Sequence, residues 1–134
     1  MKARPADPAR LIAVDDVELE TDQVHFEQMV EFYGQILGFH RTAPVSQDPH
    51  EPARFWSDKI ELRIRPVADP SIASVHQRLA VEIRAFDALL ERLDEGRHEY
   101  ELVRGVAPTD HRIEMLDPAG HRVVIRRHWP GVLL

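Results

Sequence analysis

The chain of 134 residues contains no cysteine, which excludes disulfide scaffolds, zinc fingers, thiol nucleophiles and iron–sulfur clusters. It also lacks any apolar run of about 18 residues, the length that a membrane-spanning helix needs. Residues 1–8 lack the apolar stretch of a secretory signal. These absences predict a cytoplasmic protein that has no membrane partner.

Basic residues are outnumbered, because 17 Lys and Arg face 23 Asp and Glu, and the formal charge is −6. General nucleic-acid binding requires a net basic face, so a nucleic-acid partner is not expected. The glycine motifs that hold nucleotide phosphates and the GxSxG context of a serine nucleophile are also missing. Nucleotide-dependent enzymes and serine hydrolases are therefore not indicated.

The length predicts one compact domain. Residues 1–10 are polar and carry two prolines, so we expect a flexible N-terminal arm. Residues 11–128 form the predicted domain, and the apolar residues 129–134 form a C-terminal tail. Residues 66–74, with two further prolines, are typical of a linker between two halves of this domain.

The order strand, helix, three strands occurs twice, at about residues 11–65 and 78–127. In the first half, alternating apolar residues predict a strand within residues 11–20. A helix capped by Thr21 or Asp22 follows and ends at Gly38. Its apolar residues recur at helical spacing: Phe26, Met29, Val30, Tyr33, Ile36 and Leu37. The three strands predicted after it are residues 39–45, 54–56 and 60–65.

The second half shows the same order. A strand is predicted over residues 78–84 and a helix over residues 87–95 that ends at Gly96. Three further strands are predicted at residues 100–104, 112–116 and 122–127. Residues 117–120 form a predicted tight turn, with proline second and glycine fourth. Such a repeat favours two similar halves packed around one cleft.

Three segments carry a family resemblance. EFYGQILGF at residues 31–39 resembles the signature that ends the first helix in the vicinal oxygen chelate superfamily. DPAGHR at residues 117–122 resembles the hairpin before that family's last strand, and FDALLERL at residues 86–93 resembles its second-module helix. That superfamily contains glyoxalase I, extradiol dioxygenases, fosfomycin-resistance enzymes and bleomycin-binding proteins. The ordered set spans about residues 12–127.

The resemblance implies an α+β fold of two βαβββ modules that form an open barrel-like cleft. Enzymes of this family usually hold a divalent metal ion there with His, Gln or Glu. The corresponding positions of this sequence are Asp16, Glu61, Arg78 and Val124. Only two of these residues can coordinate a metal, and arginine keeps its proton at any working pH. We therefore expect a degenerate site without a metal cofactor, in which Arg78 replaces the cation and pairs with Asp16 and Glu61.

The strand faces opposite the aliphatic ones are rich in charge. If the aliphatic faces pack under the helices, the opposite faces line the cleft with six arginines and five acids. These residues are Asp16, Glu18, Glu20, Glu61, Glu82, Arg63, Arg65, Arg78, Arg84, Arg122 and Arg126. One interpretation is a solvated, salt-bridged sheet face. The other is a pocket for an anionic or zwitterionic small molecule, with Asp16, Glu61, Arg63, Arg78 and Arg122 as binding residues.

Two functions follow from the resemblance. The first is a metal-free binding protein of the bleomycin-resistance type. The alternative is a lyase, isomerase or dioxygenase that acts on a small oxygenated metabolite with one divalent metal ion, and Glu61 is then the candidate general base. His76 or His111 supplies a metal ligand if the assumed register is shifted by two residues. Whether the protein is an enzyme stays open. The apolar tail and the edge of the second half favour a homodimer.

Overall fold

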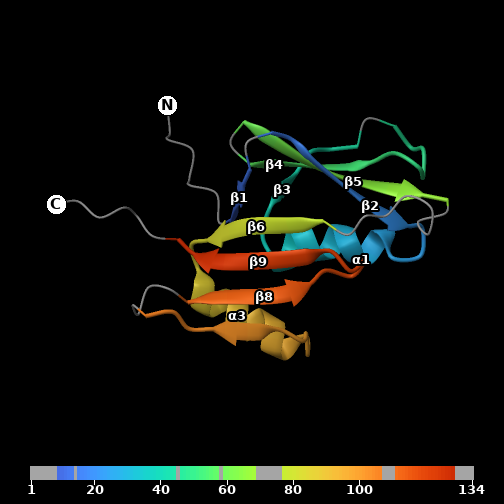
Figure 1. Ribbon diagram of the computed structural model, residues 1–134. Helices are drawn as coiled ribbons and strands as arrows, with labels where there is room; N and C mark the ends of the chain where they lie inside the picture. Colours follow the sequence, from blue (N-terminus) through green and yellow to red (C-terminus); the bar gives the residue numbers. More distant parts are fainter. Residues whose placement is uncertain are drawn as a thin grey trace.

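The computed structural model describes residues 9–13, 15–44, 46–57, 59–68, 77–106 and 111–128 (Figure 1). A short strand, β1 (Ala9–Ile12), comes first. The first module comprises β2 (Val17–Asp22), α1 (Phe26–Glu31), the π-helical turn η1 (Phe32–Ile36), β3 (His40–Arg41), β4 (Ala53–Ser57) and β5 (Ile60–Val67). The second comprises β6 (Arg78–Ile83), α3 (Phe86–Glu95), β7 (Glu101–Val103), β8 (Arg112–Leu116) and β9 (Arg122–Arg127).

Each module forms its own mixed sheet with the same strand order. In the first sheet the order is β2-β5-β4-β3, and in the second it is β6-β9-β8-β7 with β1 added beside β6. The first and last strands of each module run parallel, and the remaining neighbours within the module run antiparallel. The predicted α+β class with two βαβββ modules is confirmed.

The N-terminal strand corrects the sequence prediction. We expected one strand within residues 11–20, but the structure has two, and they lie in different sheets. β1 pairs antiparallel with β6 of the second module, with Leu11 opposite Val81, whereas β2 belongs to the first. Residues 9 and 10, assigned to the arm, therefore belong to a sheet, while residues 1–8 lie outside the described residues. The alternation of apolar residues is local and cannot show which distant strand each segment pairs with.

The first helix ends as the sequence predicts, but it begins at Phe26 with His25 as its N-cap, rather than with the predicted cap Thr21 or Asp22. Asp22 Oδ1 accepts a hydrogen bond from the backbone N–H of His25 at 2.7 Å, and this bond is the main cause that lowers the pKa of the Asp22 carboxyl. The helix continues as one π-helical turn and stops before Gly38, whose φ of 93° is the left-handed conformation that glycine adopts without strain. The strand predicted at residues 39–45 is shorter, since β3 spans only two residues.

The aliphatic faces of the strands pack against the helices. Leu19, Leu62, Ile64, Val81 and Ile125 are all fully buried in the core. Tight packing of these residues stabilises both sheets through removal of apolar surface from water. The opposite face of each sheet therefore carries the charged residues, which confirms the predicted division into an aliphatic and a charged face.

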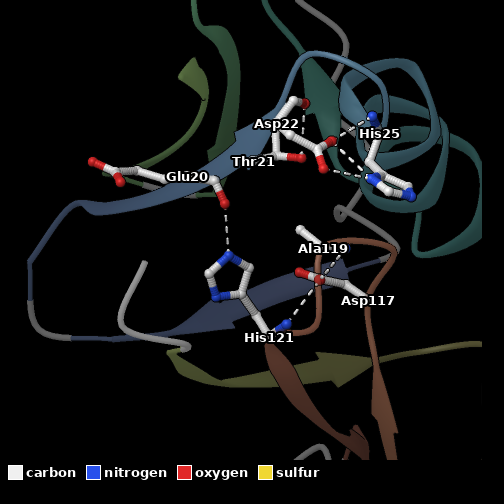
Figure 2. Close-up of polar contacts among 7 residues, drawn as sticks. All are labelled: Glu20, Thr21, Asp22, His25, Asp117, Ala119 and His121. Carbon is white, nitrogen blue, oxygen red and sulfur yellow. Dashed lines mark hydrogen bonds and ion pairs between the residues drawn. The ribbon is translucent and has the colours of Figure 1, made fainter. Parts of the chain in front are cut away.

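Polar contacts join the two modules. The Tyr33 hydroxyl of the first module donates to Asp117 Oδ2 of the second at 2.7 Å, and both residues are buried. His121 is also buried, and its Nδ1 accepts from the N–H of Gln77 at 2.9 Å. Its Nε2 therefore carries the proton and donates to the carbonyl of Glu20 at 2.9 Å (Figure 2). The hairpin at residues 117–122 therefore has a structural role, because its buried Asp117 and His121 bond to the first module.

Candidate functional site

The charged faces of the two sheets carry arginines directly opposite one another. Arg78 faces Arg122 across β6 and β9, and Arg112 faces Arg126 across β8 and β9. In the other sheet, Arg54 faces Arg63 across β4 and β5. Like charges that face each other across two strands destabilise a sheet. Three such pairs lie on the faces without helices, where the like charges need a carboxylate or an anion to compensate them.

On the second-module sheet, three arginines surround one carboxylate. Glu114, on β8, has a side chain that is only 18% exposed. Its oxygens lie 3.7 Å from Arg112 Nε, 3.8 Å from Arg122 Nη1 and 3.9 Å from Arg78 Nη2. One carboxylate neutralises only one of these three cations. Glu101 on β7 lies directly opposite Glu114 and adds a second carboxylate to this face. The cluster of Arg78, Arg112, Arg122 and Glu114, with Glu101 beside it, therefore keeps one positive charge that an anion can compensate.

This cluster corrects the predicted partner of Arg78. The sequence analysis paired Arg78 with Asp16 and Glu61, but the structure pairs it with Glu114. The reason is the topology, because Arg78 lies in the sheet of the second module and Glu61 in the sheet of the first. Glu114 did not stand out in the sequence, although it lies inside a predicted strand of alternating residues.

On the first-module sheet, the predicted residues Asp16, Glu61 and Arg63 do come together. Asp16 Oδ1 accepts a hydrogen bond from the backbone N–H of Glu61 at 2.8 Å. Glu61 is buried, and its Oε1 lies 3.4 Å from Arg54 Nη1 and 3.5 Å from Arg63 Nε. Glu18 extends the network to Arg65, because its oxygens lie 3.9 Å from Arg63 Nε and from Arg65 Nη1. Opposite charges thus alternate across this face.

The residues at the family's metal positions do not fit a metal ion. Glu61 faces two guanidinium groups, which compete with a cation for its oxygens, and Asp16 is engaged with a backbone N–H. Arg78 and Val124 offer no lone pair. Within the described ranges, no three His, Asp or Glu side chains gather into a possible metal site. A catalytic metal ion generally needs about three such ligands.

The other histidines that the structure describes take no part in such a group. His111 lies just before β8 and is partly buried, and His76 lies outside the described residues. His25 contacts Asp22, with its Nδ1 2.7 Å from Asp22 Oδ1. His128 Nδ1 contacts Glu82 Oε1 at 2.5 Å on the second-module sheet. Each of these two histidines thus contacts a single carboxylate.

A groove of about 610 Å³ borders the arginine cluster of the second module. Glu114, Leu116 and Arg122 line one side of it, and residues 97–101, which lead from α3 into β7, line the other. The groove is large enough for a small organic molecule. It places polar and charged groups beside the exposed apolar side chain of Leu116.

The sequence belongs to a known family. The family model described as Glyoxalase/Bleomycin resistance protein/Dioxygenase superfamily matches residues 17–125. The two βαβββ modules define the class of fold, and the match covers both of them. The chain is a member of this superfamily. A search of curated protein sequences finds no match.

Solved structures of the same fold agree with this assignment. A glyoxalase family protein from Bacillus anthracis is 18% identical, with a TM-score of 0.65 over 96% of this chain and 100% of that chain. TnmS3, an antibiotic binding protein from Streptomyces sp. CB03234, is 17% identical, with a TM-score of 0.63 over 88% of this chain and 98% of that one.

A third similar structure contains a metal ion. It is a variant of the fosfomycin resistance protein FosX from Listeria monocytogenes, in complex with Mn(II) and 1S,2S-dihydroxypropylphosphonic acid. It is 12% identical, with a TM-score of 0.66 over 89% of this chain and 94% of that chain. At these identities the likeness shows the fold alone. In the described parts of the present chain, every helix is too short or too polar to cross a membrane.

Proposed function

We propose that this protein binds a small anionic or zwitterionic molecule on the arginine-bearing faces of its two sheets, without a metal ion. The observation that carries the proposal is the set of three arginine pairs that face each other across neighbouring strands. This arrangement costs stability, and a shared anion offsets the cost. Arginine suits the task because its planar guanidinium binds carboxylate and phosphonate groups through two parallel hydrogen bonds.

Asp16 and Glu61 give the proposed ligand its second contact. The Glu61 carboxylate lies beside Arg63, and the Asp16 carboxylate accepts from the backbone N–H of Glu61. We expect both carboxylates to accept hydrogen bonds from an amino or hydroxyl group of a zwitterionic ligand. The fold supports this use, because one protein of the same fold binds an antibiotic and another holds a phosphonic acid. A role of Glu61 as general base stays a prediction of the sequence, as does a cytoplasmic location.

We also propose that the protein is a homodimer. β7 lies at the edge of the second-module sheet, so one side of its backbone lacks a neighbouring strand within the described residues. Leu102 on this strand is 37% exposed, and Val106 just beyond it is fully exposed. Exposed edge strands that carry apolar side chains favour pairing with another chain.

The ligand proposal is tested by removal of the arginines. Simple carboxylates, phosphonates and phosphate esters are titrated into the wild type, R63A and the double variant R78A/R122A, with calorimetry and thermal melting as readouts. We expect at least one anion class to bind the wild type and to bind one of the variants about 10- to 100-fold more weakly, as the loss of a charged hydrogen bond implies.

Arg41→Ala is the matched control for these variants. Arg41 is exposed on β3, directly opposite the core residue Phe55, so it lies on the side of the sheet away from the charged face. Its loss is therefore expected to leave anion binding unchanged. Equal binding by the wild type and all arginine variants contradicts the proposal. Stoichiometric metal retained after loading with Zn, Ni, Mn or Fe(II) and desalting also contradicts it, and favours the metal-dependent lyase or dioxygenase instead.

A further inference from the structure

An aromatic side chain stands exposed in the middle of the first-module sheet. Trp56 lies on β4, an interior strand, so neighbouring strands flank it on both sides. Trp56 remains 41% exposed, although tryptophan is one of the residues that gain most from burial. It lies on the charged face, directly opposite Glu61 of β5 and His40 of β3. Since the position is not at a sheet edge, strand pairing with another chain does not explain the exposure.

Two incompletely paired guanidinium groups lie in the next row of the same face. Arg54 precedes Trp56 by two residues and therefore points to the same side of the sheet. Arg54 and its cross-strand partner Arg63 share one oxygen of Glu61. The Nε atom of each arginine is buried and makes no hydrogen bond among the described residues, although Arg63 Nε lies 3.5 Å from Glu61 Oε1 in an ion pair. The two side chains together hold ten N–H donors, and the carboxylates of Glu61 and Glu18 cannot satisfy all of them.

The spacing between the ring and the arginines selects a class of ligand. Residues two apart on a strand are separated by about 6.6–6.8 Å. A flat ring that stacks on Trp56 can therefore carry an acidic group that reaches Arg54 and Arg63. An aliphatic acid satisfies the arginines but leaves the indole face uncovered. A neutral aromatic compound covers the indole but leaves the guanidinium donors unpaired.

We infer that Trp56 is the stacking surface of the ligand site on the first-module sheet, and that the ligand is a planar aromatic carboxylic acid. This inference rests on the proposed anion binding and adds the aromatic ring to it. Trp56 supplies the face for the ring, Arg54 and Arg63 bind the carboxylate, and Glu61 holds the two arginines in place. Stacking on an indole ring favours flat aromatic rings over saturated rings of similar size.

The test uses three probes that separate the ring from the acid: 2-naphthoate, cyclohexanecarboxylate and 2-naphthalenemethanol. Each is titrated by calorimetry into the wild type, W56L and W56F. We expect 2-naphthoate to bind the wild type most tightly. W56L weakens its binding by about 2- to 12-fold, the range expected for one aromatic pair, while W56F restores most of it. Binding of cyclohexanecarboxylate changes by less than about twofold, because that probe has no π face.

Val24→Ala controls for the loss of an exposed apolar side chain, since Val24 is 82% exposed in the turn before α1. Thermal melting establishes that each variant is folded. If both acids bind the wild type and W56L with the same affinities, the aromatic inference is overturned while anion binding stands. A third outcome is that 2-naphthoate and 2-naphthalenemethanol bind the wild type with equal affinity, and that W56L weakens the binding of both while W56F does not. The ring site then stands and the anion proposal is overturned. No binding of any probe overturns the inference.

Discussion

Tyr33 shows how a single residue joins the two modules. Its ring is fully buried beside Phe32, at 5.0 Å between ring centroids, and its hydroxyl donates to the buried Asp117. The other oxygen of Asp117 accepts from the N–H groups of Ala119 and His121 and so fixes the turn before β9. The hydroxyl of Tyr33 is thus the link between the first helix and this turn.

Replacement of Tyr33 by phenylalanine removes this link and leaves one oxygen of Asp117 buried without a donor. We expect Y33F to lower the free energy of unfolding by about 1–3 kcal/mol at neutral pH, the cost of an unsatisfied buried polar atom. Urea unfolding measures the change. Y100F is the control, because the Tyr100 hydroxyl contacts Asp94 in an exposed position. Its expected effect is below about 0.5 kcal/mol.

The same residue predicts an alkaline loss of stability. Burial raises the pKa of Tyr33 well above its ordinary value of 10.0, and the negative charge of Asp117 adds to the shift. Above about pH 10 the unfolded chain loses the Tyr33 proton while the folded chain keeps it, so the free energy of unfolding falls as pH rises. Y33F removes this contribution and gives a flatter pH profile than the wild type above about pH 10. The hydrogen bond to Asp94 raises the pKa of Tyr100 as well, so Y100F is the control for stability at neutral pH only. Equal slopes for Y33F and the wild type would mean that Tyr33 is accessible to water.

At the scale of elements, β1 connects the two sheets. The strand pairs with β6 in the second-module sheet, while the N–H of Leu11 donates to Ser57 Oγ of the first-module sheet at 2.8 Å. Leu11 and Ser57 are both buried. β1 therefore contributes one hydrogen bond to a sheet other than its own.

Ser57→Ala tests the value of that bond. It leaves the buried N–H of Leu11 without an acceptor, so we expect a loss of about 1–3 kcal/mol in the free energy of unfolding. Faster hydrogen exchange of the Leu11 amide locates the loss in β1. Ser46→Ala is the matched control, since Ser46 is exposed and bonds only locally in the loop before β4. A stability equal to that of the wild type would show that β1 is held by β6 alone.

At the scale of the whole molecule, the proposed homodimer makes a prediction about mass. Light scattering at micromolar concentration gives twice the chain mass of 15.4 kDa if β7 pairs with a second copy. The double variant L102K/V106K places charges on this edge and shifts the mass to that of one chain. Val24→Lys is the control, because it adds a charge at an exposed position before α1. A wild-type mass of 15.4 kDa contradicts the dimer.

The sequence by itself determined the modular fold, because the signals for it are local. Period-two alternation marked β5, β6 and β9, helical spacing marked the first helix, and Gly38 marked its end. The motif at residues 31–39 and the turn at residues 117–120 indicated the family. The charged faces also followed from alternation, since side chains in a strand point to opposite sides.

Tertiary structure decided which of these residues meet. The separation of β1 from β2, the contact of Arg78 with Glu114, and the central position of Trp56 all depend on pairing between distant strands. The contact between Asp16 and Glu61 was predicted correctly from the sequence, whereas the predicted contact of Arg78 with them was wrong. Strand order joins segments that lie tens of residues apart, and no local pattern of side chains records which segments these are.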